Sequence, residues 1–141
     1  MKIVIASDHA GYLKKQKLIK KLKNYNLIDL GTNSLDSVDY PIYAKKVCDE
    51  VNKGADFGIL LCGTGIGMSI AANKIKNIRC AKVNSVLEAK LSRNHNNANV
   101  IALSSKMSMF KMVKIVKTFL EANEEIEQRH IKRIEMLDIN D

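Results

Sequence analysis

The chain has 141 residues, of which 46% are hydrophobic, so it is long enough for one compact domain, residues 1–141, with a buried core. No stretch approaches the roughly 18 apolar residues of a membrane span, and the N-terminus lacks the layout of a signal peptide. We therefore expect a cytosolic protein without a membrane partner. The three cysteines include no C-x-x-C pair, which indicates free thiols and neither a disulfide framework nor a metal site.

The net charge of +8 is compatible with a nucleic-acid partner, but the pattern of the lysines argues against one. They are spread along predicted helix faces and are not grouped with aromatic residues that could stack on bases. A solvated basic surface is the simpler interpretation. An anionic small substrate would also suit this charge, because positive potential steers negative ligands toward a site.

Short apolar or β-branched runs alternate along the chain with longer segments of helical period, which indicates a βα succession. The predicted strands lie at 2–6, 26–30, 57–61, 79–82 and 99–103. A helix is predicted over 10–24, and Pro41 suits the first turn of the next one. A further helix should open near Met68.

The last two helical segments differ in pattern. Segment 108–122 has apolar residues at three- and four-residue spacing, which predicts a face buried in the core or an interface: Met109, Met112, Val113, Val116, Phe119 and Leu120. Segment 123–141 is predicted to be a charged helix without a continuous apolar stripe. Such a helix is able to reach a partner subunit.

Parallel strands joined by helices need cover on both faces, and the uninterrupted apolar run 59–61 suits a central strand. We predict an α/β fold: a three-layer α/β/α, Rossmann-like domain with a five-stranded parallel sheet. Ligands of such sheets lie beyond the carboxyl ends of the strands, near a topological switch point. Those ends carry Asp8 and His9, the segment 62–67, and the segment 104–106.

The segment 62–67, Cys-Gly-Thr-Gly-Ile-Gly, places a thiol beside backbone amides at a predicted helix start. Such amides attract anions and favour a thiolate. The spacing matches neither G-x-G-x-x-G nor a P-loop, so a nucleotide is disfavoured. Cys62 as a base and the Thr64 hydroxyl would suit proton abstraction next to a carbonyl. A tight turn with a structural cysteine fits the segment equally well.

The histidines and the C-terminal arginines supply further candidates. His9 follows the first strand, and His95 lies in an asparagine-rich segment, where it could act as an acid or base or simply belong to a turn. For His130, a surface or capping role is the ordinary expectation.

Arg129 and Arg133 share a helix face and could bind one phosphate together. An exposed ion pair of Arg129 with Glu125 is the simpler alternative, which the residues alone favour.

Seven motifs follow one another along nearly the whole chain: Ser7-Asp8-His9-Ala10-Gly11, Asp29-Leu30-Gly31-Thr32, Asp39-Tyr40-Pro41, 62–67, Ala71-Ala72-Asn73-Lys74, 92–100, and Arg129-His130 with Arg133. In this order they resemble the motifs of the ribose-5-phosphate isomerase B group, which also contains galactose-6-phosphate isomerase subunits and an allose-6-phosphate isomerase.

The resemblance implies an aldose-ketose isomerase that interconverts ribose 5-phosphate and ribulose 5-phosphate in the pentose phosphate pathway. It implies an enediolate intermediate and neither a metal nor another cofactor. Cys62 would move the proton, and the Thr64 hydroxyl would position the reacting group. His95 would open the sugar ring. The enediolate oxygens would be held by Asn96 and the loop amides, including those of Gly63, Gly65 and Gly67.

The same resemblance assigns phosphate binding to His9, Arg129, Arg133 and Lys106, and places Asp8 and Tyr40 near the substrate hydroxyls. It implies active sites between subunits, in a homodimer or a dimer of dimers.

Two alternatives to this function stay open. Cys62 with Met68 resembles the cysteine branch of the family, and the presence of both the cysteine loop and the His95 segment favours ribose phosphate. A six-carbon aldose phosphate is the alternative substrate. A noncatalytic module that binds an anionic ligand, such as a sugar-phosphate sensor or a nucleic-acid binder, is the alternative class of protein.

Overall fold

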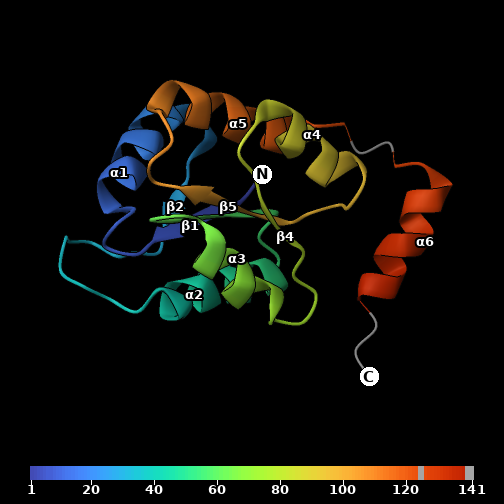
Figure 1. The fold of residues 1–141 in the computed structure, drawn as a ribbon, viewed down its shortest axis with the longest axis horizontal. Helices are drawn as coiled ribbons and strands as arrows, with labels where there is room; N and C mark the ends of the chain where they lie inside the picture. Colours follow the sequence, from blue (N-terminus) through green and yellow to red (C-terminus); the bar gives the residue numbers. More distant parts are fainter. Residues whose placement is uncertain (124–125, 139–141) are drawn as a thin grey trace.

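Five parallel strands form one sheet in the order β2-β1-β3-β5-β4, as seen in the computed structural model, which describes residues 1–123 and 126–138 (Figure 1). The strands are β1 (Ile3–Ser7), β2 (Ile28–Asp29), β3 (Phe57–Cys62), β4 (Cys80–Lys82) and β5 (Val100–Ser104). Every residue of β1 and β3 is buried, as their continuous apolar sequences require. In register, Ile5 pairs with Ile59, which pairs with Ile101, so β3 is the central strand.

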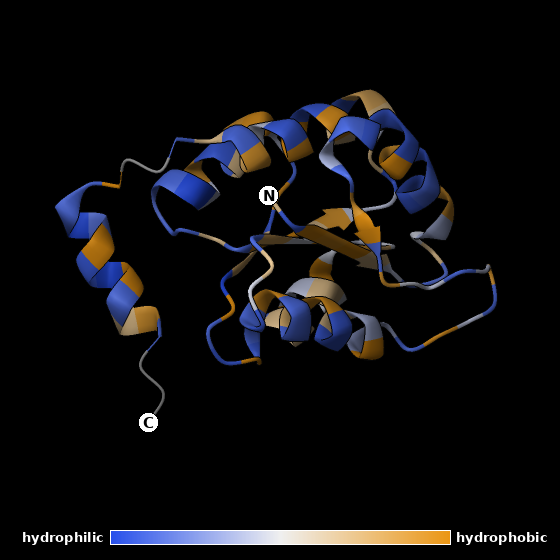
Figure 2. Ribbon diagram, turned by 180° about the vertical axis from the view of Figure 1, so that it is seen from behind, coloured by the Kyte–Doolittle hydropathy of each residue, from blue (hydrophilic) through white to orange (hydrophobic). Residues whose placement is uncertain are grey.

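Helices cover both faces of the sheet, which confirms the predicted three-layer α/β/α arrangement (Figure 1). On one side lie α1 (Tyr12–Lys21), α4 (Val86–Asn94) and α5 (Met109–Glu121), and on the other α2 (Tyr40–Asn52) and α3 (Ile66–Asn73). A short 3₁₀ helix, Lys23–Tyr25, follows α1. The strands are mainly hydrophobic, whereas the helices mix hydrophobic and hydrophilic residues (Figure 2). This pattern is expected of helices that bury one face on a sheet.

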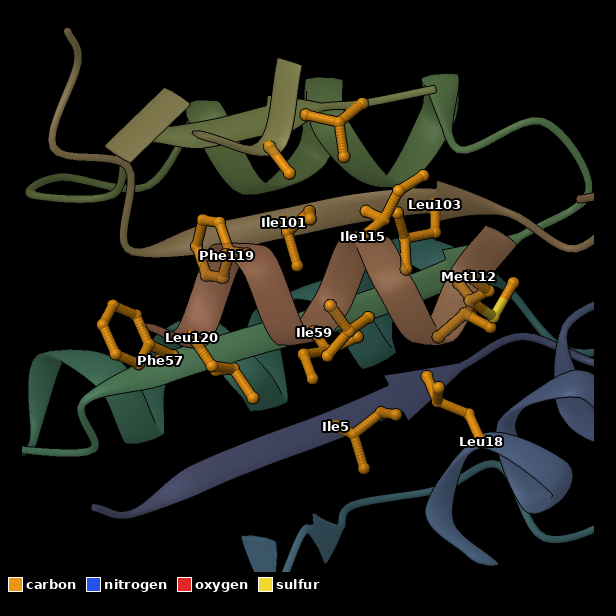
Figure 3. Close-up of a cluster of buried hydrophobic side chains, with 14 of the residues drawn as sticks. Ile5, Leu18, Phe57, Ile59, Ile101, Leu103, Met112, Ile115, Phe119 and Leu120 are labelled. Atoms are coloured by element: carbon orange, nitrogen blue, oxygen red, sulfur yellow. The ribbon is translucent and has the colours of Figure 1, made fainter. Parts of the chain in front are cut away.

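The larger core cluster lies between the sheet and α5 (Figure 3). Met112, Ile115 and Phe119 point from α5 toward the strands, and all three are fully buried. The Phe119 ring meets the Phe57 ring edge to face, with 5.3 Å between centroids. The apolar spacing predicted for 108–122 therefore marks a core face, and Phe110, which lies outside that pattern, is exposed.

The final helix, α6 (Gln128–Leu137), stands beside the sheet and not against either face (Figure 1). His130 and Ile134 are its buried residues. Its end is tied to the domain by an ion pair between Asp138 and Arg79, with 2.9 Å between Oδ2 and Nη1. A charged helix is thus observed within the predicted segment 123–141.

Several boundaries differ from the predicted ones. Strand β2 pairs over two residues instead of the predicted 26–30, because Asn26 adopts a left-handed conformation (φ 52°) before it. Helix α3 begins at Ile66, two residues before Met68, since Gly65 caps it directly. Helix α1 begins at Tyr12, because the preceding residues form a turn in which Asp8 Oδ1 accepts the Gly11 N–H at 3.0 Å.

We predict that Leu103→Ala destabilises the protein far more than Leu87→Ala. Leu103 is fully buried in β5, whereas Leu87 in α4 is 63% exposed. The buried truncation leaves a cavity and should lower the free energy of unfolding by about 2 to 5 kcal/mol. The exposed one should change it by less than about 0.5 kcal/mol. Urea denaturation measures both, and equal effects would contradict the core described for β5.

Candidate active site

The topological switch point of the sheet lies between β1 and β3. These strands are neighbours, but β1 leads into α1 on one face and β3 leads into α3 on the other (Figure 1). Ligands of open α/β sheets bind at such a point, beyond the carboxyl ends of the strands. Asp8 and His9 follow β1 here, and Cys62 ends β3.

The loop after β3 places a backbone amide against the Cys62 sulfur. Cys62 is only 5% exposed, and its Sγ accepts the N–H of Gly65 at 3.1 Å. Gly65 has φ 79°, and a Cβ there would lie 3.0 Å from the Leu103 carbonyl carbon. Glycine is therefore required both by the conformation and by the close approach to β5. The loop holds the sulfur as an acceptor at the start of α3, where free amides favour an anion.

Polar side chains fix the rest of this loop. The Thr64 residue is exposed, and its Oγ1 accepts the N–H of Ile66 at 3.2 Å. Ser104 Oγ, at the end of β5, donates to the Gly63 carbonyl at 2.8 Å and accepts the N–H of Lys106 at 3.2 Å. Because Ser104 contacts both residues, Lys106, which is exposed, lies at the same end of the sheet as the loop after Cys62.

Asp8, His9 and Tyr40 lie around the same edge. The Asp8 N–H donates to the Leu61 carbonyl at 3.2 Å, which ties the turn after β1 to β3. His9 Nδ1 accepts the N–H of Val38 at 3.1 Å, so in the neutral ring the proton is on Nε2, which can donate to a ligand. The Tyr40 ring covers the first turn of α3, since a Cβ on Gly67 would lie 2.7 Å from Tyr40 Cζ.

The remaining predicted residues lie at the opposite edge of the sheet. His95 caps the C-terminus of α4, and Asn96 follows it shortly before β5 begins. At about 3.3 Å per residue, the length of β3 separates the two edges by roughly 17 Å. Arg129 and Arg133 are exposed on α6, beside His95. One chain therefore brings Cys62, Thr64, His9 and Lys106 to one edge, and His95, Asn96 and the arginines to the other.

His130 is buried, with 8% of its surface exposed, and the surface or capping role expected from the sequence is therefore wrong. Its ring stacks on that of His95, with 4.2 Å between centroids and 16° between planes. Burial, followed by the nearby His95 and Arg129, lowers the pKa of His130. No local pattern marks this contact, because it joins α4 to a helix without an apolar stripe.

Ser7 and Arg129 are two further polar residues at these edges of the sheet. Ser7 ends β1 with a buried Oγ that has no hydrogen-bond partner within the described residues. Its only sequence signal is a hydroxyl at the end of an apolar strand. Arg129 pairs with Glu127 at 2.9 Å, whereas Glu125, its alternative predicted partner, lies outside the described residues.

Residues 1–123 and 126–138 contain neither a group of metal-ligating side chains nor a membrane-spanning helix. Over these ranges, no three His, Cys, Asp or Glu side chains are grouped as a metal site would need. No helix in the same part of the chain has the length and apolar character to cross a membrane.

Comparison with known proteins identifies the class to which this arrangement belongs. The family model for ribose/galactose isomerases matches residues 3–137. A probable ribose-5-phosphate isomerase B of Mycoplasma genitalium is 45% identical, covering 96% of this chain and 92% of the relative. Ribose-5-phosphate isomerase B of Escherichia coli is 41% identical, covering 96% and 93%. The chain therefore belongs to the ribose/galactose isomerase family, as its motifs predict.

Solved structures agree with this assignment. The ribose-5-phosphate isomerase B of Clostridium thermocellum superposes with a TM-score of 0.94 at 43% identity, covering 98% of this chain and 95% of that one. The Mycoplasma genitalium enzyme with bound ribulose-5-phosphate superposes with a TM-score of 0.89 at 44% identity, covering 97% and 93%. The fold predicted from the sequence is thus that of the family.

We predict that mild acid loosens α6. The docked state favours neutral His130, because its pKa is lowered there, whereas an undocked histidine titrates near pH 6.5. As the pH falls through that range, only undocked His130 binds a proton readily, so docking weakens. His95, Arg129 and Arg133 oppose the added charge, and Glu127 favours it.

Hydrogen exchange of residues 128–137, corrected for intrinsic rates, should show less protection at pH 5.5 than at pH 7.5. The variant His130→Phe keeps an aromatic ring and should lose most of this dependence. Equal protection of the unaltered chain at both pH values would contradict the prediction.

Proposed function

We propose that residues 1–141 form one sugar-phosphate isomerase domain that interconverts ribose 5-phosphate and ribulose 5-phosphate. The observation that carries this proposal is the Cys62 thiol at the switch point, where its Sγ accepts the Gly65 amide of the glycine loop and His9 follows the neighbouring strand β1. Family membership supports it, as does the relative with bound ribulose-5-phosphate. A cytosolic location suits this substrate.

Cys62 is the proposed base. Its thiolate takes the proton from C2 of the open-chain aldose, and the electrons move to O1 to give an enediolate. The O2 proton then passes to O1, the electron pair on O2 forms the C2 carbonyl, and return of the carbon proton from Cys62 to C1 gives the ketose. Proton transfer alone moves the carbonyl, so the proposed reaction uses neither a metal nor a cofactor.

The loop amides are the proposed stabilisers of the enediolate. Those of Gly63, Gly65 and Gly67, together with Asn96 of a second subunit, would donate to its oxygens, and the Thr64 hydroxyl would position the reacting carbons. Loss of one such donor costs other enzymes about 3 kcal/mol of barrier. The glycine conformations that orient these amides therefore matter as much as the thiol itself.

The substrate phosphate would be bound by His9 and Lys106 from one subunit and by Arg129 and Arg133 from another. His9 Nε2 is available as a donor because Nδ1 already accepts from Val38. Asp8 and Tyr40 would contact sugar hydroxyls at the same edge.

His95 is the proposed acid/base for opening the furanose ring. Since it lies across the sheet from Cys62 in its own chain, a complete site requires two copies, in a homodimer or a dimer of dimers. The exposed apolar residues Ile66 and Ile70 beside the cysteine loop, and Met136 and Leu137 on α6, are suited to burial between copies.

Replacing the base should separate binding from turnover. Cys62→Ala should lose most of the conversion of ribose 5-phosphate while it still binds the substrate, because the thiol acts in the transition state. Cys48→Ala is a matched control, since Cys48 is buried in the core and burial raises its pKa to about 12. Coupled assays measure ribulose 5-phosphate, and calorimetry measures binding. Normal turnover by Cys62→Ala would identify another base.

A shared site should show complementation between inactive subunits. Cys62→Ala and His95→Ala are each expected to be nearly inactive alone. Mixed subunits should recover up to about a quarter of the original activity, because hybrid dimers hold one site with both residues intact. Failure of a verified hybrid to regain activity would argue against sites that combine Cys62 and His95 from different chains.

A further inference from the structure

Helix α6 presents two neighbouring faces with different properties. His130 and Ile134, four residues apart, are both 8% exposed and face the domain. Arg129 and Arg133 are offset from them by one residue and are exposed. One rigid turn of helix therefore carries the proposed phosphate-binding arginines and an inward-facing histidine.

The inward-facing histidine meets the proposed ring-opening residue directly. The rings of His130 and His95 lie nearly parallel, with 4.2 Å between centroids. His95 is the C-cap residue of α4 and is exposed. Its position in α4 therefore does not by itself restrict the orientation of its ring. Face-to-face contact fixes the plane of an imidazole while leaving the two nitrogens, which lie at the ring edge, open to a substrate.

From this geometry we infer that His130 is a positioning residue, which holds the His95 imidazole in the plane required for ring opening and links it to the phosphate-binding face of α6. The inference rests on the proposed function, in which His95 acts on the sugar ring. A bound phosphate that fixes Arg129 and Arg133 would also fix His130, and through the stack it would fix His95.

His130 itself is poorly placed to carry protons. Its Nε2 is buried and has no hydrogen-bond partner within the described residues, so this nitrogen has no described neighbour to which it could pass a proton. The nearby Arg129 and Arg133 also disfavour a positive charge on His130. Its contribution is therefore the ring face, which an aromatic substitute should reproduce.

Three variants of the full chain test this role. His130→Ala removes the ring, His130→Phe keeps a ring without nitrogens, and Glu135→Ala alters an exposed position of the same helix as the matched control. With ribose 5-phosphate, His130→Ala should lower kcat/KM about tenfold or more, because small misplacements of a reacting group are costly. His130→Phe should retain most of the activity, and the control should match the unaltered chain.

Nuclear magnetic resonance gives a readout that a merely structural role would not move. The chain has three histidines, so the imidazole signals can be assigned by single substitutions. The His95 ring protons should show an upfield ring-current shift that persists in His130→Phe and disappears in His130→Ala, while the backbone spectrum of the domain stays unchanged.

Specific results would overturn the inference. They are unchanged kcat/KM in His130→Ala, activity in His130→Phe as low as in His130→Ala, or a His95 signal that does not respond to loss of the His130 ring. Failure of the unaltered chain to isomerise ribose 5-phosphate would instead refute the proposed function, and the His95 signal would still show whether His130 orders that ring.

Discussion

All five strands run in the same direction, and this constraint determines which residues of one chain can meet. Parallel strands send all their carboxyl ends to one edge, and each connecting helix returns the chain to the other. Cys62 ends a strand, Asp8 and Lys106 come shortly after strands, and all three therefore gather at the first edge. His95 follows a helix and therefore lies at the second. A site that uses both Cys62 and His95 must be assembled from more than one copy of such a chain.

Glycines allow the segments around the cysteine loop to pack closely against the backbone of the sheet. A Cβ on Gly11 would lie 2.9 Å from the Leu61 Cβ, so the start of α1 rests directly on the end of β3. Gly65 similarly contacts the backbone of β5. These contacts leave little room for the loop to shift relative to the sheet, because packed interiors resist even small volume changes. The rigid core therefore fixes the orientation of the loop amides next to Cys62.

The sequence predicted the layers and the loop well because their signals are local. Apolar runs marked β3 and β5, and helical spacing marked the buried face of α5. Edge strand β2 was overestimated, since its apolar composition does not reveal that Asn26 turns the chain before pairing begins. The stack of His130 on His95 could not be predicted, because it depends on the path of α6 and no periodic pattern encodes that path.

Helix α6 depends on contacts with the domain for its own stability. It has ten residues and buries only two, and an isolated helix shorter than about 12 residues is marginal in water. Arg79 ties it down, donating through Nη1 to Asp138 and through Nε to the Asn97 carbonyl at 2.9 Å. The segment that carries His95 and the helix that carries His130 therefore share one arginine as a common anchor. Because Arg79 contacts both elements and His130 stacks on His95, a displacement of α6 would also change the surroundings of the His95 ring.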